Sequence, residues 1–407
     1  MTLKGHLLLA CTLWSVVLLA VSPYAREAQR AQDKVPHPDL SLFTHSENCV
    51  ACHNTLMSAA GEDVSIGATW RSTMMANSAR DPYWQAAVRR ETTDHARRSA
   101  DIQNECAACH MPMSQKIAHA SGLKGEVFTH LPIAGPTGSP LERLASDGVS
   151  CTVCHQIAPD KLGTRESFNA NFALLATRAD GSRLAFGPYR VDNGRQSIMR
   201  SVTGFVQSEA THIRQSELCA SCHTLITDAY GANGEVIGSL PEQMNYQEWL
   251  HSAFSKEERS CQSCHMPAVT GPVRTSSVLG DVRDGMAQHV FVGGNAFMVR
   301  MLNRYRDELG VIALPSELDA TAQATMGQLQ GETATLAISP LEMSAGQLRF
   351  SVDVRNLTGH KFPTGYPSRR SWLHVTVRNG GTVVFQSGAV EPTGAIRGGD
   401  SDVEARR

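Results

Sequence analysis

The sequence predicts a chain with two folded parts. Residues 45–315 are expected to form a mainly α-helical and irregular domain, and residues 325–407 a small all-β, sandwich-like domain. The first part contains helix-start signals separated by long loops with Gly and Pro, and it is not strand-like. The second part contains short runs in which apolar and polar residues alternate. The full length of 407 residues is sufficient for two such domains.

The N-terminal residues 1–25 are expected to form an export signal. Lys4 provides a positive start, and an apolar core runs from Leu7 to Ala20. Because this core is shorter than the about 20 residues that span a bilayer comfortably, cleavage is favoured. An uncleaved anchor would instead tether the protein to a membrane, and Cys11 leaves lipidation as a further alternative. Residues 26–44 are polar and are expected to be a linker.

Three helices are expected in the first folded part. Asp81 followed by Pro82 predicts a helix start, since aspartate caps free N–H groups and proline fits the first turn. This helix is expected to run towards Ile102. Residues 243–254 and 296–309 have similar patterns. The loops between these segments are long for an ordinary domain, so the fold requires apolar surface from another source.

The second part is predicted to contain strands at 333–338, 347–355, 372–379 and 382–386. Their alternation has the period of a half-buried strand. The triplet Asn379-Gly380-Gly381 predicts a hairpin turn between the last two strands. Residues after 398 do not resemble a closing strand, which leaves two alternatives open, a complete chain and a truncated version of a longer one.

Ten of the 11 cysteines fall into five C-x-x-C-H motifs between residues 49 and 265. In chain order, motifs 1 to 5 contain the cysteine pairs Cys49 and Cys52, Cys106 and Cys109, Cys151 and Cys154, Cys219 and Cys222, and Cys261 and Cys264. The histidines that follow are His53, His110, His155, His223 and His265.

This spacing is typical of covalent haem attachment. Two thiols add across the two vinyl groups of one porphyrin, and the next residue presents an imidazole to the iron. A disulfide, a thiol redox pair or half of a zinc site could use C-x-x-C alone. None of these explains a histidine after every second cysteine. The sequence therefore predicts five covalently attached haem c groups, which would also supply the missing apolar surface.

The motifs do not identify the ligand on the opposite side of each iron. Ten other histidines remain outside the N-terminal stretch: His37, His45, His95, His119, His130, His212, His251, His289, His360 and His374. Each could equally be a surface or hydrogen-bonded histidine. His45 and His212 precede a motif closely, so either would have to serve a neighbouring haem. Met74 and Met75 are alternative ligands, although core packing is the simpler interpretation.

The chain resembles a family of secreted multihaem c-type cytochromes, within the broad group of tetrahaem cytochromes and octahaem hydroxylamine oxidoreductase-type proteins. Besides the five motifs, the stretches that carry the resemblance are residues 61–67, 70–84, 147–150, 289–295 and 356–370. The resemblance covers most of residues 45–380. It implies a periplasmic or otherwise exported electron carrier in a respiratory system.

The resemblance also bears on the ligands of the irons. It favours His289 and His360, which lie inside the shared stretches, as axial ligands. His95, His130 and His212 are the next candidates. His360 falls between the predicted strands 347–355 and 372–379, so we expect this loop to leave the β domain and reach the haem domain. The alternative is a loop that only packs.

Electron transfer along closely spaced haems is the expected function, and an electron carrier is favoured over a catalytic oxidoreductase. The alternative is an oxidoreductase that acts on a small nitrogen or sulfur compound at one open haem. A third hypothesis is a subunit role in which the β domain docks onto a larger assembly. The formal net charge of -2 argues against nucleic-acid binding.

Haem attachment alters the charge of the protein and hence the expected partner. Five ferric haems, each with a net charge of about -1, would take the formal charge of -2 to about -7. We therefore expect redox partner proteins with a basic docking patch.

Overall fold

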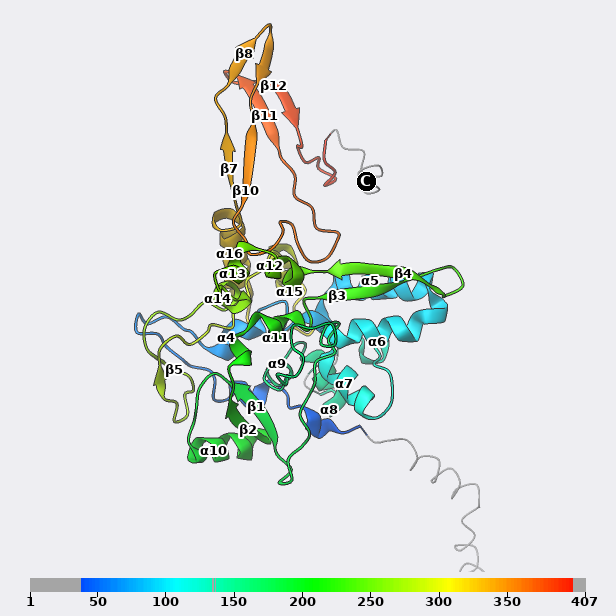
Figure 1. Ribbon diagram of the computed structural model, residues 1–407, viewed down its shortest axis with the longest axis vertical. Helices are drawn as coiled ribbons and strands as arrows, with labels where there is room; N and C mark the ends of the chain where they lie inside the picture. The colour runs from blue at the N-terminus through cyan, green and yellow to red at the C-terminus, as the bar shows by residue number, and fades with distance from the viewer. Residues whose placement is uncertain (1–37, 134, 136, 398–407) are drawn as a thin grey trace, which may run out of the picture.

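The computed structural model describes residues 38–133, 135 and 137–397. The expected export signal or anchor at 1–25, including Cys11, and most of the expected linker lie outside the described residues. Figure 1 shows a body that contains the helices and an elongated arm that projects from it. We use "body" for residues 38–331 and "arm" for residues 334–387. No helix in these described parts is long and apolar enough to cross a membrane.

The body is built from short helices joined by loops. Its α-helices are α3 (Glu47–Val50), α4 (Ile66–Arg71), α5 (Pro82–Asp94), α6 (Ser99–His110), α7 (Pro112–Ala120), α8 (Pro140–Ser146), α9 (Cys151–Cys154), α10 (Asn193–Thr203), α11 (Ser216–Ala220), α12 (Asn245–Leu250), α13 (Ala253–Lys256), α14 (Cys261–His265), α15 (Ala296–Arg304) and α16 (Pro315–Gly331). Single 3-10 turns are η2 (Leu40–Leu42), η3 (Ser78–Arg80), η4 (Ala96–Arg98), η5 (Phe128–His130) and η6 (His212–Arg214).

Helix α5 begins where the sequence predicts. The Asp81 carboxylate accepts hydrogen bonds from the backbone N–H groups of Tyr83 and Trp84, and Pro82 occupies the first turn. The expected continuation to Ile102 is interrupted at His95, where η4 separates α5 from α6. Helix α6 then leads directly into motif 2.

Helix α16 crosses the boundary that the sequence predicts between the two parts. Its first turn is capped by Glu317, whose carboxylate accepts the Leu314 N–H at 2.9 Å. The same carboxylate receives two hydrogen bonds from Arg71 of α4, from Nε at 2.7 Å and from Nη2 at 2.5 Å. A bidentate pair of this kind fixes orientation as well as distance. The start of α16 is therefore attached to the rest of the body, and its end leads into the arm (Figure 1).

Within the part of the chain that the structure describes, the strands form six two-stranded sheets. In the body, β1 (Arg183–Gly187) pairs parallel with β2 (Phe205–Glu209), and two antiparallel pairs are β3 (Leu225–Tyr230) with β4 (Val236–Gln243) and β5 (Val273–Arg274) with β6 (Val282–Arg283). In the arm, three antiparallel pairs are β7 (Ala334–Ile338) with β10 (Val352–Asn356), β8 (Glu342–Ser344) with β9 (Gln347–Arg349), and β11 (Val375–Asn379) with β12 (Thr382–Ser387).

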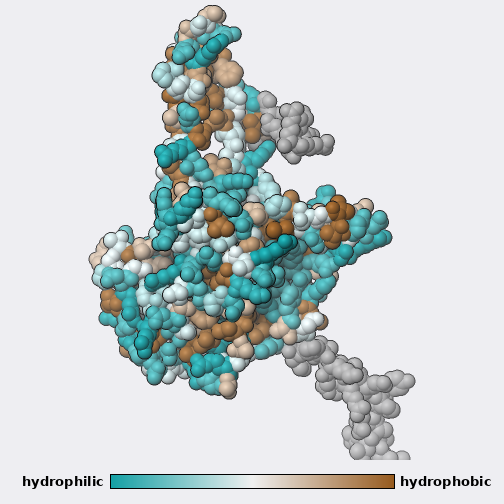
Figure 2. Space-filling model, in the orientation of Figure 1, coloured by the Kyte–Doolittle hydropathy of each residue, from teal (hydrophilic) through white to brown (hydrophobic). Residues whose placement is uncertain are grey.

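The arm differs from the expected sandwich. In the described residues its strands form three two-stranded ribbons. The β8–β9 pair continues the β7–β10 hairpin to its tip, with the Ser339 N–H donating to the Ser351 carbonyl at 3.0 Å between them. Large apolar side chains such as Ile338 and Phe385 stay more than half exposed, and Figure 2 shows brown, apolar surface along the arm. The alternation of apolar and polar residues predicts strands, but it does not predict a second sheet that covers them. The local pattern alone therefore does not determine how these ribbons assemble.

Candidate haem sites

Each of the five motifs lies on or directly beside a short helix. Motifs 1, 3, 4 and 5 begin in α3, α9, α11 and α14, and motif 2 forms the end of α6. Residues three apart in a helix lie on the same face. The two cysteines of a motif can therefore present their sulfurs to one side, and the following histidine emerges as the helix ends.

Four motif histidines are held in the same way. In each, Nδ1 lies within hydrogen-bond distance of a backbone carbonyl, which can only accept. The pairs are His53 with Thr275 at 2.7 Å, His110 with Ser78 at 3.0 Å, His155 with Phe186 at 2.5 Å and His265 with Val292 at 2.6 Å. Nδ1 must therefore carry the proton, which leaves the lone pair on Nε2. This is the usual arrangement of a metal-ligating histidine.

Burial also keeps three of these imidazoles neutral. It lowers the pKa of His110 to about 4, and it lowers the pKa of His155 and of His265 below the ordinary value. A hydrogen bond to a carbonyl acts in the opposite direction and is the smaller effect in all three. Because only the neutral ring has a free lone pair, these side chains are ready to bind a metal at neutral pH.

Two motif histidines face a second histidine from elsewhere in the chain. The ring centroids of His155 and His289 are 6.4 Å apart with an interplanar angle of 19°. Those of His265 and His360 are 6.3 Å apart with an angle of 12°. In both His289 and His360, Nδ1 again lies near a backbone carbonyl, at 3.1 and 3.0 Å. Nε2 is thus the nitrogen left for a ligand role.

These separations fit a metal between the two rings. Because a metal–imidazole bond is about 2.0–2.1 Å long and the ring centre lies about 1.1 Å behind the nitrogen, two imidazoles on opposite sides of one metal have centroids about 6.2–6.4 Å apart. Parallel rings in direct face-to-face contact would lie closer. The residues present therefore fit a haem iron with one imidazole on each side at motifs 3 and 5.

The other three predicted ligands are not stacked opposite a motif histidine in the described residues. His130 is in η5, and its Nδ1 is buried without a hydrogen-bond partner among the described atoms. His95 ends α5 with its ring tilted at 57° to Tyr230. His212 is buried, and its Nε2 is bonded to the Ile157 carbonyl at 2.8 Å. That hydrogen bond competes with metal binding through the same nitrogen.

Two further alternatives from the sequence have other partners. His45 Nε2 lies 3.2 Å from the Asp147 carboxylate. Met74 packs against the cluster between α15 and α16 that contains Val299 and Leu302. Both observations favour a structural role for these side chains.

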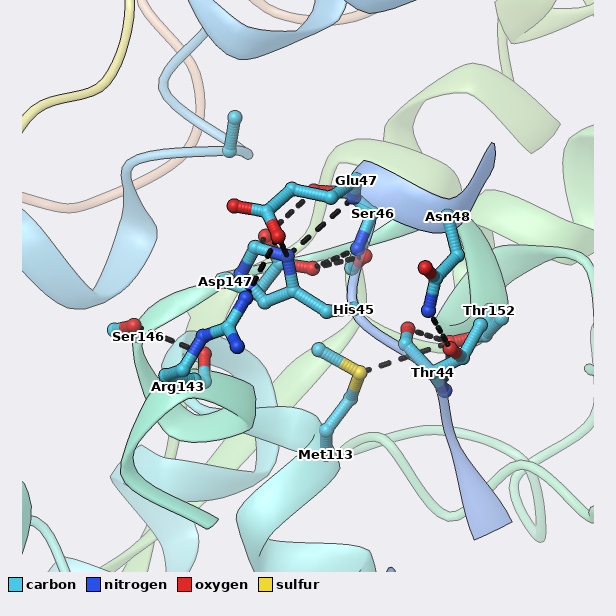
Figure 3. A network of polar contacts seen from close by, with 12 residues as sticks. Thr44, His45, Ser46, Glu47, Asn48, Met113, Arg143, Ser146, Asp147 and Thr152 are labelled. Atoms are coloured by element: carbon cyan, nitrogen blue, oxygen red, sulfur yellow. Dashed lines mark hydrogen bonds and ion pairs between the residues drawn. The ribbon is translucent and has the colours of Figure 1, made fainter. Parts of the chain in front are cut away.

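Asp147 connects motifs 1 and 3, a role that the sequence does not indicate. Its buried carboxylate accepts the Ser46 N–H at 2.9 Å and the Ser46 hydroxyl at 2.7 Å, just before α3 (Figure 3). It also accepts the Ser150 hydroxyl at 2.6 Å, just before α9. Burial raises the pKa of Asp147, and these hydrogen bonds oppose the effect. The only signal in the sequence was that Asp147 and Ser150 lie in one of the resemblance stretches.

Gly148 allows Asp147 and motif 3 to reach these positions. Its φ is +63°, and a Cβ at this residue would lie 2.6 Å from the Met75 carbonyl oxygen. Any other residue would therefore be strained and would clash with the backbone. The same carbonyl accepts the Val149 N–H at 2.9 Å.

Trp84 is a second residue whose role the sequence did not indicate. Its ring stacks on His110 with centroids 4.3 Å apart and an interplanar angle of 3°. Together with the Ser78 carbonyl, this contact fixes the rotation of the His110 ring.

Comparison with known proteins gives no match to a family model, a curated protein or a solved structure. Within the described residues, no group of three or more His, Cys, Asp or Glu side chains is arranged to hold a metal ion. The candidate sites are instead pairs of imidazoles next to pairs of thiols.

Proposed function

We propose that this chain is an exported, multihaem c-type cytochrome that carries five covalently attached haem c groups and transfers electrons in a respiratory chain. The observation that carries the proposal is the spacing of the two histidine pairs, His155 with His289 and His265 with His360. The five C-x-x-C-H motifs supply the attachment chemistry. The expected location is the periplasm or another exported compartment.

The side chains have distinct roles in this proposal. The ten motif cysteines form thioether bonds, and the five motif histidines ligate iron through Nε2. His289 and His360 are the ligands on the opposite side at motifs 3 and 5. When bound, haem supplies an iron that accepts and releases one electron. Backbone carbonyls accept from Nδ1 of four motif histidines and of His289 and His360. These carbonyls hold the six imidazoles in orientation and increase their basicity.

At motifs 3 and 5 a second imidazole would hold the haem iron from the opposite side, which favours a carrier over an enzyme there. A small substrate needs an iron with an open position, and a second imidazole closes it. The alternative, an oxidoreductase for a small nitrogen or sulfur compound, would use motif 1, 2 or 4. The proposed partners are redox proteins with a basic docking patch, and nucleic acid is not among them.

Optical and EPR spectra of the purified protein test this proposal, recorded oxidised and reduced, with and without carbon monoxide. We expect low-spin haem signals that carbon monoxide leaves unchanged. One high-spin haem that binds carbon monoxide would favour the oxidoreductase. Absence of any haem signal from protein made in cells with a functioning c-type maturation system would refute both.

A further inference from the structure

The motifs are not arranged in space in the order of the chain. Motif 4 and motif 5 are joined by backbone and side-chain hydrogen bonds. The Cys261 N–H donates to the Ser216 hydroxyl of α11 at 3.0 Å, and Gln262 Nε2 donates to the Gln215 carbonyl at 2.8 Å. The Cys219 thiol lies beside that of Cys261, and this neighbour raises the pKa of Cys219.

Motif 4 also adjoins motif 2, although motif 3 separates them in the sequence. Ala108 and Cys109 of motif 2 belong to the same apolar cluster as Cys222 of motif 4, together with Leu218 of α11. Within this cluster the Cys109 thiol lies beside the Cys222 thiol, which raises the pKa of Cys109. Both cysteines of motif 4 thus lie against a cysteine of another motif.

Motif 3 is the third neighbour of motif 4. Val153, between the two cysteines of motif 3, is 1 % exposed and packs in the cluster that also contains Cys222. The loop that follows motif 3 continues the contact, because the Ala170 N–H donates to the Ser221 carbonyl at 2.7 Å. The Asn169 N–H donates to the Thr224 carbonyl at 3.1 Å.

Motif 1 adjoins motif 3 instead. Besides the Asp147 contacts, the Thr152 hydroxyl donates to the Thr44 carbonyl at 3.1 Å (Figure 3). The Cys49 thiol lies beside the Cys151 thiol, which lowers the pKa of Cys49.

We propose that motif 4 is the junction of a branched array, in which motifs 2, 3 and 5 each adjoin motif 4 and motif 1 adjoins motif 3. The inference rests on the proposed function. Each cysteine sulfur is the atom through which a porphyrin is attached, so contact between sulfurs of two motifs brings the edges of two attached groups together. Electron transfer slows steeply as centres move apart, and these contacts therefore define the route. The array has three ends, at motifs 1, 2 and 5.

The iron positions in the holoprotein test the proposal directly. They can be located by anomalous X-ray scattering from crystals, after intact mass has established that five haems are attached. We expect the four shortest iron–iron separations to join motifs 1 and 3, 3 and 4, 2 and 4, and 4 and 5. Any other set, including a single file in chain order, overturns the junction. Fewer than five haems in the mass measurement would instead contradict the proposed function.

Variants provide a second, functional readout. Cys219→Ser/Cys222→Ser removes the attachment at motif 4, and Cys106→Ser/Cys109→Ser is the matched control at an end of the array. In redox titrations followed by EPR, loss of the motif 4 group should shift the midpoint potentials at motifs 2, 3 and 5 and leave motif 1 unchanged. Loss of the motif 2 group should shift only the midpoint potential at motif 4. Equal shifts of midpoint potential at all remaining groups in both variants would contradict the junction. If either variant fails to fold, the iron positions in the unmodified holoprotein decide the question.

Discussion

The imidazole of His360, on the loop between β10 and β11, lies parallel to that of His265 at the end of α14, with ring centroids 6.3 Å apart. The loop is held in place by Glu248 of α12, whose carboxylate accepts the Lys361 N–H at 3.0 Å and the Thr364 hydroxyl at 2.6 Å. The arm thereby returns to the body at motif 5. A shared metal between the two rings would strengthen that attachment.

Replacing His360 tests whether the arm contributes a ligand. In His360→Ala the proposed iron at motif 5 loses one imidazole, so we expect one haem to become high-spin, to bind carbon monoxide and to change its midpoint potential. Optical and EPR spectra measure the first two effects, and a redox titration measures the third.

The control for this experiment is His374→Ala. His374 also belongs to the arm, but its Nε2 contacts Gln386 Nε2 at 3.0 Å and is exposed. The optical and EPR spectra of this variant should be the same as those of the unmodified protein. If His360→Ala behaved as the control does, the arm would not ligate iron.

Asp147 is expected to contribute substantially to stability. In Asp147→Asn the Ser46 N–H and the two serine hydroxyls lose part of their acceptor, and His45 Nε2 loses its contact with a carboxylate. Leaving such groups without full partners costs about 1–3 kcal/mol. Denaturant unfolding measures the loss, with the exposed Asp160→Asn as control. A loss in the free energy of unfolding no larger than that of the control would mean that the network in Figure 3 is dispensable.

Glu105 gives the protein a stability that depends on pH. Burial, and secondarily repulsion from Asp228, Glu242 and Asp101, raises the pKa of Glu105 from 4.5 to about 7. Between these values the folded protein retains a proton that the unfolded chain releases, so the free energy of unfolding should fall as pH rises through this window.

Glu105→Gln should remove that part of the pH dependence and leave the stability at lower pH unchanged. Denaturant unfolding between pH 4.5 and 8 is the measurement. An identical slope in the variant would show that another group is responsible. Since Glu105 precedes Cys106, its ionisation should also lower the midpoint potential of the group at motif 2.

Lys116 is expected to set the potential at the junction. Its Nζ donates to the Ala170 carbonyl at 2.8 Å, and its charge acts on the thiols of Cys109 and Cys222. A positive charge favours the more negative, reduced state, so Lys116→Met should lower the midpoint potentials at motifs 2 and 4. Lys116→Arg should largely retain them. A redox titration measures these potentials. The control in this titration is Lys124→Met, because Lys124 is exposed and paired with Asp101.

Local signals in the sequence predicted several elements well. The cap at Asp81 predicted the start of α5, and Asn379-Gly380-Gly381 predicted the turn between β11 and β12, where Asn379 pairs with Thr382. Both depend on residues adjacent in the chain. Gly380 has the positive φ that such a two-residue turn requires.

Features that depend on distant residues were not predictable in this way. The run 347–355 was expected to be one strand but forms β9 and β10, because its two halves pair with different partners. The parallel pairing of β1 with β2 has no signature in either strand. The partners of His155 and His265 lie elsewhere in the chain. The count of remaining histidines and the resemblance gave His289 and His360 as candidates, and the fold brings them next to the motif histidines.

The intact mass of the purified, exported protein, combined with a count of its thiols, tests the central claim most directly. The account predicts the mass of the chain plus five haems and no titratable thiol among the ten motif cysteines. A mass without haem, whether the motif cysteines are free, joined as disulfides or bound to zinc, would contradict it.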